Sequence, residues 1–213
     1  MSEMKRVAGE IAAAEPRIDV LINNAGAVFD RRHVTSEGLE LTFATNHMSY
    51  FVLTHGLRER LLASAPARVV NTSSEAHRRM KIDFSDLQVR DYGGFKAYGR
   101  SKLSNILFTR ELARTLAGTG VTANCLHPGF VNTRIGDQGK GIVASLFRLA
   151  KKFALSPGKG AETIIFLASA KEVAGVTGEY FYQCRPNTPS IEAQDDQTAG
   201  RLWQVSSELA SLF

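Results

Sequence analysis

The sequence predicts an α/β fold in which a doubly wound parallel sheet carries helices on both faces. Segments typical of helices alternate with short apolar segments typical of buried strands, and the connections between them are short. Strands in this order become parallel through right-handed crossovers. The chain shows no internal repeat and no low-complexity linker, so we expect residues 1–213 to form a single domain.

The first half of the chain supplies two strands and two helices. Good helix formers over residues 4–15 favour a helix that Pro16 stops. The apolar run at 18–22 predicts a strand that is buried on both faces. A helix is expected over residues 45–63 and the second strand over residues 68–72.

The second half continues the alternation. Residues 97–116 predict a long helix with one apolar side, formed by Leu103, Ile106, Leu107, Leu112 and Leu116. The third strand is expected over residues 121–126, and Pro128-Gly129 closes it. A helix over residues 161–168 and a strand over residues 179–182 complete the pattern.

Composition excludes several classes of protein. The hydrophobic content of 44% excludes a disordered chain, and two cysteines, Cys125 and Cys184, exclude a disulfide scaffold. The net charge of +5 is spread among both signs, without the dense basic stripe that nucleic-acid binding needs. The sequence has neither an apolar run of about 18 residues for a membrane span nor a signal peptide, so a cytoplasmic location is expected.

Small polar residues follow the predicted strands at the point where each strand ends. The first strand runs into Asn23-Asn24-Ala25-Gly26, the second into Thr72-Ser73-Ser74, and the third into His127-Pro128-Gly129. Ligands of doubly wound sheets bind at these carboxyl ends. Small side chains there let the backbone approach a flat or phosphorylated ligand, although a plain turn explains the first of these segments equally well.

Tyr98 and Lys102 are four residues apart on the long helix and therefore share one face. An ammonium group beside a phenol lowers the pKa of the tyrosine, which makes it a usable acid or base. By itself the pair is more typical of a solvated helix surface, but it opens the helix that follows the strand ending at Ser74. Ser74 is placed to donate to a substrate oxygen, and Asn46 to hold a water. The sequence offers no metal-ligand set and no paired carboxylates.

The order and spacing of these motifs resemble the short-chain dehydrogenase/reductase family along nearly the whole chain. The finer features resemble its retinol-dehydrogenase-like branch. They are Asn46-His47, the Ala-Tyr-x-x-Ser-Lys-Leu-x-Asn run from Ala97 to Asn105, His127-Pro128-Gly129, and Leu202-Trp203.

The resemblance implies a Rossmann-type fold and hydride transfer between NAD or NADP and an alcohol or carbonyl substrate. Tyr98 would be the acid/base, Lys102 would lower its pKa and bind the nicotinamide ribose, Ser74 rather than Ser73 would polarise the substrate oxygen, and Asn46 would anchor a relay water. The residues expected to contact the cofactor are Asn23, Ala25, Gly26, Tyr98, Lys102, Pro128, Gly129, Val131 and Thr133. Family members commonly dimerise, so a homodimer is expected.

One family feature has no counterpart here, the Gly-rich turn that follows the first strand and seats the cofactor's pyrophosphate. The N-terminal strands of the family fold are therefore expected to be absent, which leaves the strand at 18–22 with a bare edge. Two explanations remain, a start codon placed too far downstream or a real truncation; the first is favoured. The glycine cluster at 136–141 fits a flexible lid better than a dinucleotide fingerprint. We expect the chain by itself to bind a nicotinamide cofactor weakly.

The preferred hypothesis is thus an oxidoreductase with a small, lipophilic substrate. The amphipathic segment at 142–155 suggests a lid over an apolar pocket, and contact with a membrane surface is the less favoured interpretation. The main alternative is a non-catalytic fragment of the same fold that acts as an interaction or regulatory protein. A sugar-nucleotide epimerase is disfavoured because those relatives have a longer C-terminal region.

Overall fold

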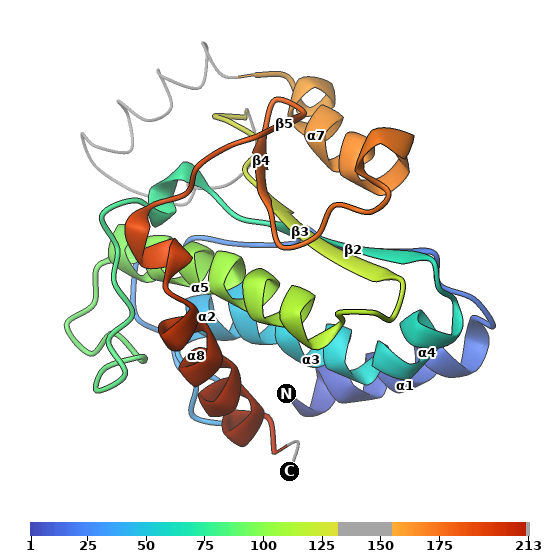
Figure 1. Ribbon diagram of the computed structural model, residues 1–213. Helices are drawn as coiled ribbons and strands as arrows, with labels where there is room; N and C mark the ends of the chain where they lie inside the picture. Colours follow the sequence, from blue (N-terminus) through green and yellow to red (C-terminus); the bar gives the residue numbers. More distant parts are fainter. Residues whose placement is uncertain (132–154, 212–213) are drawn as a thin grey trace.

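The strands form one five-stranded sheet with the order β1-β2-β3-β4-β5 (Figure 1). The computed structural model describes residues 1–131 and 155–211. The strands are β1 Val20–Asn23, β2 Ala67–Thr72, β3 Val121–Leu126, β4 Tyr180–Tyr182 and β5 Arg185–Pro186. The first four are parallel, which confirms the prediction, and β5 is a short antiparallel addition that the sequence did not suggest.

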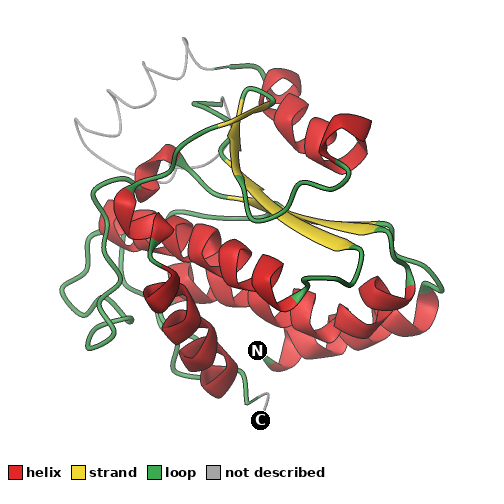
Figure 2. Ribbon diagram, viewed as in Figure 1, coloured by secondary structure: helices red, strands yellow, loops and turns green. Residues whose placement is uncertain are grey.

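Helices cover both faces of this sheet, as the doubly wound class requires (Figure 2). One side carries α1 Ser2–Ala14, α3 Ser49–Gly56, α4 Arg58–Ala63, α5 Gly94–Thr115 and α8 Asp196–Leu209, and the other carries α7 Pro157–Ser169. In the described residues, short 3-10 turns join these elements, η2 Glu75–His77, η4 Lys171–Val173 and η5 Ile191–Gln194. The sequence reasoning missed α8, which packs along α5.

The predicted single helix over residues 45–63 is wrong in detail. Helical structure begins earlier, with α2 Leu41–Phe43, and passes through a π-helical turn, η1 Ala44–Met48, before it divides into α3 and α4. The break falls at Leu57, whose backbone angles of φ −96° and ψ 1° leave the helical region. Gly56 precedes it, and glycine weakens a helix because it has the most backbone freedom to lose.

Two helix starts are set by side chains that the periodicity did not reveal. The carboxylate of Glu40 accepts hydrogen bonds from the backbone N–H groups of Thr42 at 2.7 Å and Phe43 at 2.8 Å, so α2 begins there. The hydroxyl of Ser156 accepts from Lys159 at 3.3 Å and starts α7 before residue 161. Such caps satisfy N–H groups that have no partner within the helix.

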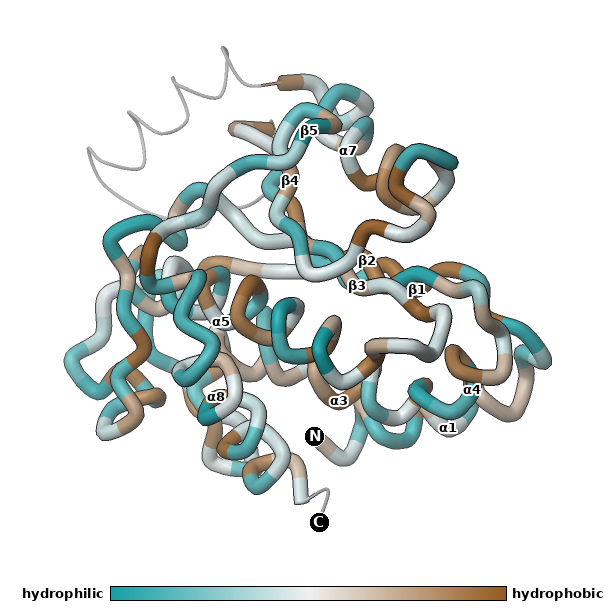
Figure 3. The backbone as a smooth tube through the Cα atoms, in the orientation of Figure 1, coloured by the Kyte–Doolittle hydropathy of each residue, from teal (hydrophilic) through white to brown (hydrophobic). Residues whose placement is uncertain are grey.

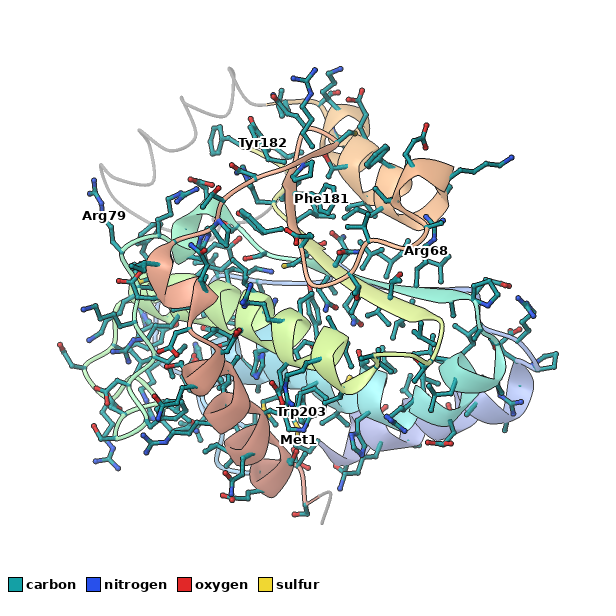
Figure 4. The ribbon with its side chains drawn as sticks, in the orientation of Figure 1. Met1, Arg68, Arg79, Phe181, Tyr182 and Trp203 are labelled. Carbon is teal, nitrogen blue, oxygen red and sulfur yellow. The ribbon has the colours of Figure 1, made fainter. Side chains whose placement is uncertain are left out.

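The apolar side of α5 is buried along its whole length, as predicted. Leu103, Ile106 and Leu107 pack with residues of α8, whereas Leu112 and Leu116 pack with the cluster under α1 and α3. Figure 3 shows hydrophobic residues along the strands and hydrophilic residues over the outer loops. On the other face, α7 and β4 form a separate cluster around Val70, Leu126, Leu167, Val173 and Phe181, and Arg68 reaches from β2 to the carbonyl of Leu167 at 2.9 Å (Figure 4).

Within the described ranges, β1 pairs only with β2. Ile22 of this strand is 45% exposed, which is unusual for a large apolar residue of a parallel sheet. The predicted bare edge is therefore present in the part of the chain that the structure describes. None of the helices in that part is both long and apolar enough to cross a membrane.

Tyr180 offers a test of this packing. Its ring lies on β4 between His77 and His127, at centroid distances of 5.3 and 5.7 Å, and its buried hydroxyl has no hydrogen-bond partner among the described residues. Because an unpaired buried hydroxyl costs stability, we expect Tyr180→Phe to raise the free energy of unfolding by about 1 kcal/mol. Urea denaturation measures this change; a loss of stability would show that the hydroxyl is satisfied.

Candidate active site

The three predicted polar segments meet at one edge of the sheet. In the strand register Asn23 lies opposite Asn71 and Thr72 lies opposite Leu126, so the chain leaves β1, β2 and β3 side by side. Below this edge, side-chain amides link β1 with β2 and with α3. Asn23 Nδ2 donates to Thr54 at 2.9 Å and to Asn71 at 2.8 Å, and Asn23 is only 3% exposed.

Gly26, Asn46 and Lys102 converge at the end of β1. A Cβ atom at Gly26 would lie 3.1 Å from Lys102 Nζ and 3.2 Å from Asn46 Oδ1, closer than side chains normally tolerate. The Asn46 side chain fixes this approach, because Oδ1 accepts from the N–H of Ala27 at 2.8 Å while Nδ2 donates to the Ala27 carbonyl at 2.9 Å. Asn46 Nδ2 also donates to Ser101 on α5 at 3.0 Å.

The ammonium of Lys102 is buried between two tyrosine rings. Nζ lies 5.7 Å from the ring centroids of both Tyr50 and Tyr98, and it donates to the carbonyl of Thr72 at 3.1 Å. Lys102 is 3% exposed, and this burial lowers the pKa of its amine to about 8. The amine can therefore gain or lose its proton close to neutral pH.

The pKa of Tyr98 moves in the direction opposite to the one predicted. Burial raises it, and the hydrogen bond with the Ser74 side chain opposes this effect only in part. The sequence placed Lys102 and Tyr98 on one face correctly, but the pattern alone does not show how deeply the phenol is buried. Desolvation of the phenolate thus outweighs the hydrogen bond with Ser74.

Of the two adjacent serines, Ser74 is the one with access to the site. The hydroxyl of Ser73 is buried and donates to the carbonyl of Lys102 at 2.7 Å, so it ties β2 to α5. The side chain of Ser74 is half-buried and meets Tyr98. This arrangement favours Ser74 as the residue that contacts a substrate oxygen.

His77 is a residue that sequence reasoning missed. It is fully buried, its Nδ1 donates to the carbonyl of Ser74 at 2.7 Å, and its Nε2 accepts from the N–H of Ser190 at 3.1 Å. It therefore connects the loop of Ser74 with the segment after β5. A lone histidine three residues beyond Ser74 gives no signal of this role in the sequence.

The loop after β3 forms the neighbouring wall. His127 stacks on Tyr182 with 4.1 Å between centroids, and its Nε2 lies 3.3 Å from a carboxylate oxygen of Glu75. Gly129 has φ of 83°, and a Cβ there would come 2.9 Å from Leu155. Pro128 lies in this loop between them, and Val131 forms a parallel bridge with Leu155. Thr133, the glycine cluster at 136–141 and most of the segment at 142–155 lie outside the described residues.

Known proteins of one kind resemble this chain. A family model described as short chain dehydrogenase matches residues 1–140. Human retinol dehydrogenase 13 is 42% identical over 220 residues, and mouse retinol dehydrogenase 12 is 44% identical over 210 residues; they cover 100% and 98% of this chain. The chain spans 66% of the length of each of these relatives.

A solved structure supports the same assignment. An uncharacterised protein from Mycobacterium paratuberculosis superposes with a TM-score of 0.76 at 31% identity, over 99% of this chain and 72% of its own. The match extends over the sheet and the helices on both of its faces. The fold predicted from the sequence is thus found in a protein of known structure.

Proposed function

The chain belongs to the short-chain dehydrogenase family, and we propose that it carries the catalytic part of an oxidoreductase that interconverts an alcohol and a carbonyl compound with NAD or NADP. The observation that supports this proposal is the convergence of Ser74, Tyr98 and Lys102 at the carboxyl ends of the strands. Retinol dehydrogenases are the named relatives, and they suggest a lipophilic primary alcohol as the substrate.

The roles of the three side chains follow from their chemistry. In the oxidation direction Tyr98 accepts the hydroxyl proton of the alcohol as the carbon gives up a hydride, and in reduction it returns the proton to the carbonyl oxygen. Ser74 donates its hydroxyl hydrogen to the same substrate oxygen and opposes the build-up of negative charge there. The ammonium form of Lys102 stabilises the phenolate of Tyr98.

The residues present fit a nicotinamide cofactor. Lys102 Nζ and Asn46 Oδ1 approach the space above Gly26 that a Cβ would otherwise fill, so a donor and an acceptor meet beside an exposed Ala25. A donor and an acceptor suit the hydroxyl groups of a ribose. Tyr98 and Lys102 would hold these ribose hydroxyls. The nicotinamide, when bound, supplies the acceptor or donor of the hydride.

Large apolar side chains near the site support a lipophilic substrate. Phe95 is three residues before Tyr98 at the start of α5 and is 66% exposed. Phe130 follows Gly129 and is 44% exposed. Exposed aromatic side chains beside Tyr98 and Gly129 in the sequence favour an apolar ligand.

The proposal is tested by mixing the protein with a series of primary alcohols that includes retinol and with NAD or NADP at concentrations raised until the rate no longer changes, because weak cofactor binding is expected, and by following the absorbance of the reduced nicotinamide. We expect turnover that rises with the apolar length of the alcohol. Absence of turnover with every alcohol and with the matching aldehydes would contradict the proposal. The homodimer and the cytoplasmic location stay predictions. So do the cofactor contacts of Asn23, Ala25, Gly26, Pro128, Gly129, Val131 and Thr133.

Gly26→Ala provides a narrower test. The added methyl group would meet Lys102 Nζ and Asn46 Oδ1 and push one of them aside. Overpacking of this kind costs about 1–3 kcal/mol, and the same displacement energy in the reaction barrier would lower turnover about 5- to 150-fold. Gly9→Ala on α1 is the matched control, because nothing lies within 4 Å of its added Cβ. Equal turnover in both variants would show that the close approach at Gly26 is unimportant.

A further inference from the structure

A buried chain of hydrogen bonds connects α8 with the candidate active site through His47 and Asn105. His47 Nε2 lies 3.0 Å from the hydroxyl of Ser206 on α8, and His47 Nδ1 lies 3.4 Å from Oδ1 of Asn105 on α5. Asn105 Nδ2 then donates to the carbonyl of Asn46 at 3.0 Å and to that of Thr72 at 3.2 Å. His47, Asn105 and Ser206 are all inaccessible to solvent.

The donor and the acceptor of each of these hydrogen bonds follow from the orientation of the Asn105 amide and from the neutral state of His47. The two partners of Asn105 Nδ2 are carbonyl oxygens, so Nδ2 is the amide nitrogen and Oδ1 is an acceptor. His47 must therefore carry its hydrogen on Nδ1, and its bare Nε2 accepts from the hydroxyl of Ser206. A neutral imidazole with its hydrogen on Nδ1 satisfies both contacts, and burial of the ring keeps His47 neutral, so Nε2 is the acceptor.

The surroundings of His47 keep it neutral. Its ring lies against Phe43, Phe51 and Phe108 at centroid distances of 5.1, 6.3 and 6.1 Å. Burial in this apolar wall lowers the pKa of His47 to about 4, and the only opposing effect is the hydrogen bond with Asn105. The tautomer is thus fixed throughout the neutral pH range, and it fixes the orientation of the Asn105 amide.

The two carbonyls that Asn105 holds belong to the site. The carbonyl of Thr72 also accepts from Lys102 Nζ at 3.1 Å, so Asn105 and Lys102 share one acceptor. Asn46 lies in the π-helical turn η1, an irregular stretch whose backbone hydrogen bonds span five residues rather than four. The side chain of Asn105, which lies on α5, donates a hydrogen bond to the carbonyl of Asn46 in this turn.

We infer that Asn105, oriented by His47 and Ser206, is a positioning residue that places the Asn46 turn and the amine of Lys102 for the reaction. The inference rests on the proposed function, because it assigns Asn105 to the same site. An asparagine is required at this position, since no other side chain of this length both accepts from an imidazole and donates to two carbonyls.

The test compares Asn105→Ala with Asn124→Ala. Asn124 is also a buried amide and also bonds two backbone groups, those of Val176 and Glu179, but it lies in β3 away from the site. Both variants lose similar hydrogen bonds, so a merely structural role predicts equal effects. We expect Asn105→Ala to lower kcat about tenfold while KM stays within about twofold, and Asn124→Ala to change neither.

The titration of Lys102 separates a positioning role from a structural one. Without Asn105, Lys102 has the carbonyl of Thr72 to itself, so its ammonium form is better stabilised and its pKa rises from about 8. The alkaline limb of the kcat profile should then move to higher pH in Asn105→Ala and stay in place in Asn124→Ala. Equal kcat losses in the two variants, or an unchanged limb in Asn105→Ala, would overturn the inference.

His47 gives a rescue experiment. His47→Asn keeps an amide donor near the position of Nδ1, whereas His47→Leu removes the donor. We therefore expect His47→Asn to retain more of kcat than His47→Leu does. The alkaline limb of its kcat–pH profile should stay where it is in the wild type. If the protein shows no turnover at all, the proposed function fails. The inference is then decided by the Lys102 signal of protein labelled with 13C-lysine, whose pKa must rise in Asn105→Ala but not in Asn124→Ala.

Discussion

Tyr98→Phe is expected to lower kcat at least about 100-fold and to leave the fold intact. The loss is expected because general acid/base catalysis by one side chain contributes about 10²–10⁴-fold to the rate. The substitution deletes a single oxygen atom. The ring of Tyr98 and its distance from Lys102 stay the same, so binding of substrate and cofactor should change little. The loss should therefore appear in kcat, measured from the formation of reduced nicotinamide, rather than in KM.

Tyr180→Phe is the matched control for this result. It also deletes a tyrosine hydroxyl, but Tyr180 is a buried residue of β4 whose hydroxyl is unpaired among the described residues. This variant should keep full turnover. If Tyr98→Phe turned over as fast as Tyr180→Phe, Tyr98 would not be the acid/base. The assignment of the active site would then be wrong.

The parts of the fold that were predicted correctly are those that hydrophobic periodicity encodes. The apolar side of α5 and the runs that became β2 and β3 need only a pattern, and a parallel order follows from the helices between them. The cap at Glu40 depends on one carboxylate and two neighbouring N–H groups, and the π-helical turn at Ala44–Met48 receives a hydrogen bond from the distant Asn105. Periodicity averages over such contacts and cannot show them.

The residues of the candidate site also divide into those that the sequence predicts and those that only the packing reveals. Placement of Ser74, Tyr98 and Lys102 at one sheet edge follows from where strands end, which the sequence reveals. His77, Asn105 and Asn46 act through backbone atoms of other segments, and these partners are set by packing rather than by spacing. The direction of the Tyr98 pKa was wrong for the same reason, since burial is a property of the whole fold.

Lys102→Met is expected to stabilise the protein at pH 7 while it abolishes turnover. Burial lowers the pKa of the amine from its ordinary 10.5 to about 8, so holding the charged form inside the fold costs about 3 kcal/mol at neutral pH. Methionine fills similar space without the charge. It gives up the hydrogen bond to Thr72, worth about 1–2 kcal/mol, so the net gain in the free energy of unfolding is roughly 1–2 kcal/mol.

The dependence of this gain on pH identifies its cause. Between pH 8 and 10.5 the amine is largely neutral in the folded protein and largely protonated in the unfolded chain, so the unfolded state binds more protons and the stability of the wild type rises with pH. Other titrating groups are common to both proteins and cancel in the difference. Urea denaturation of the two proteins from pH 7 to pH 10.5 should therefore show the advantage of Lys102→Met shrinking to zero or reversing. A difference that is constant across this range would mean that the buried charge is not what destabilises the wild type, and that the variant gains its stability from packing alone.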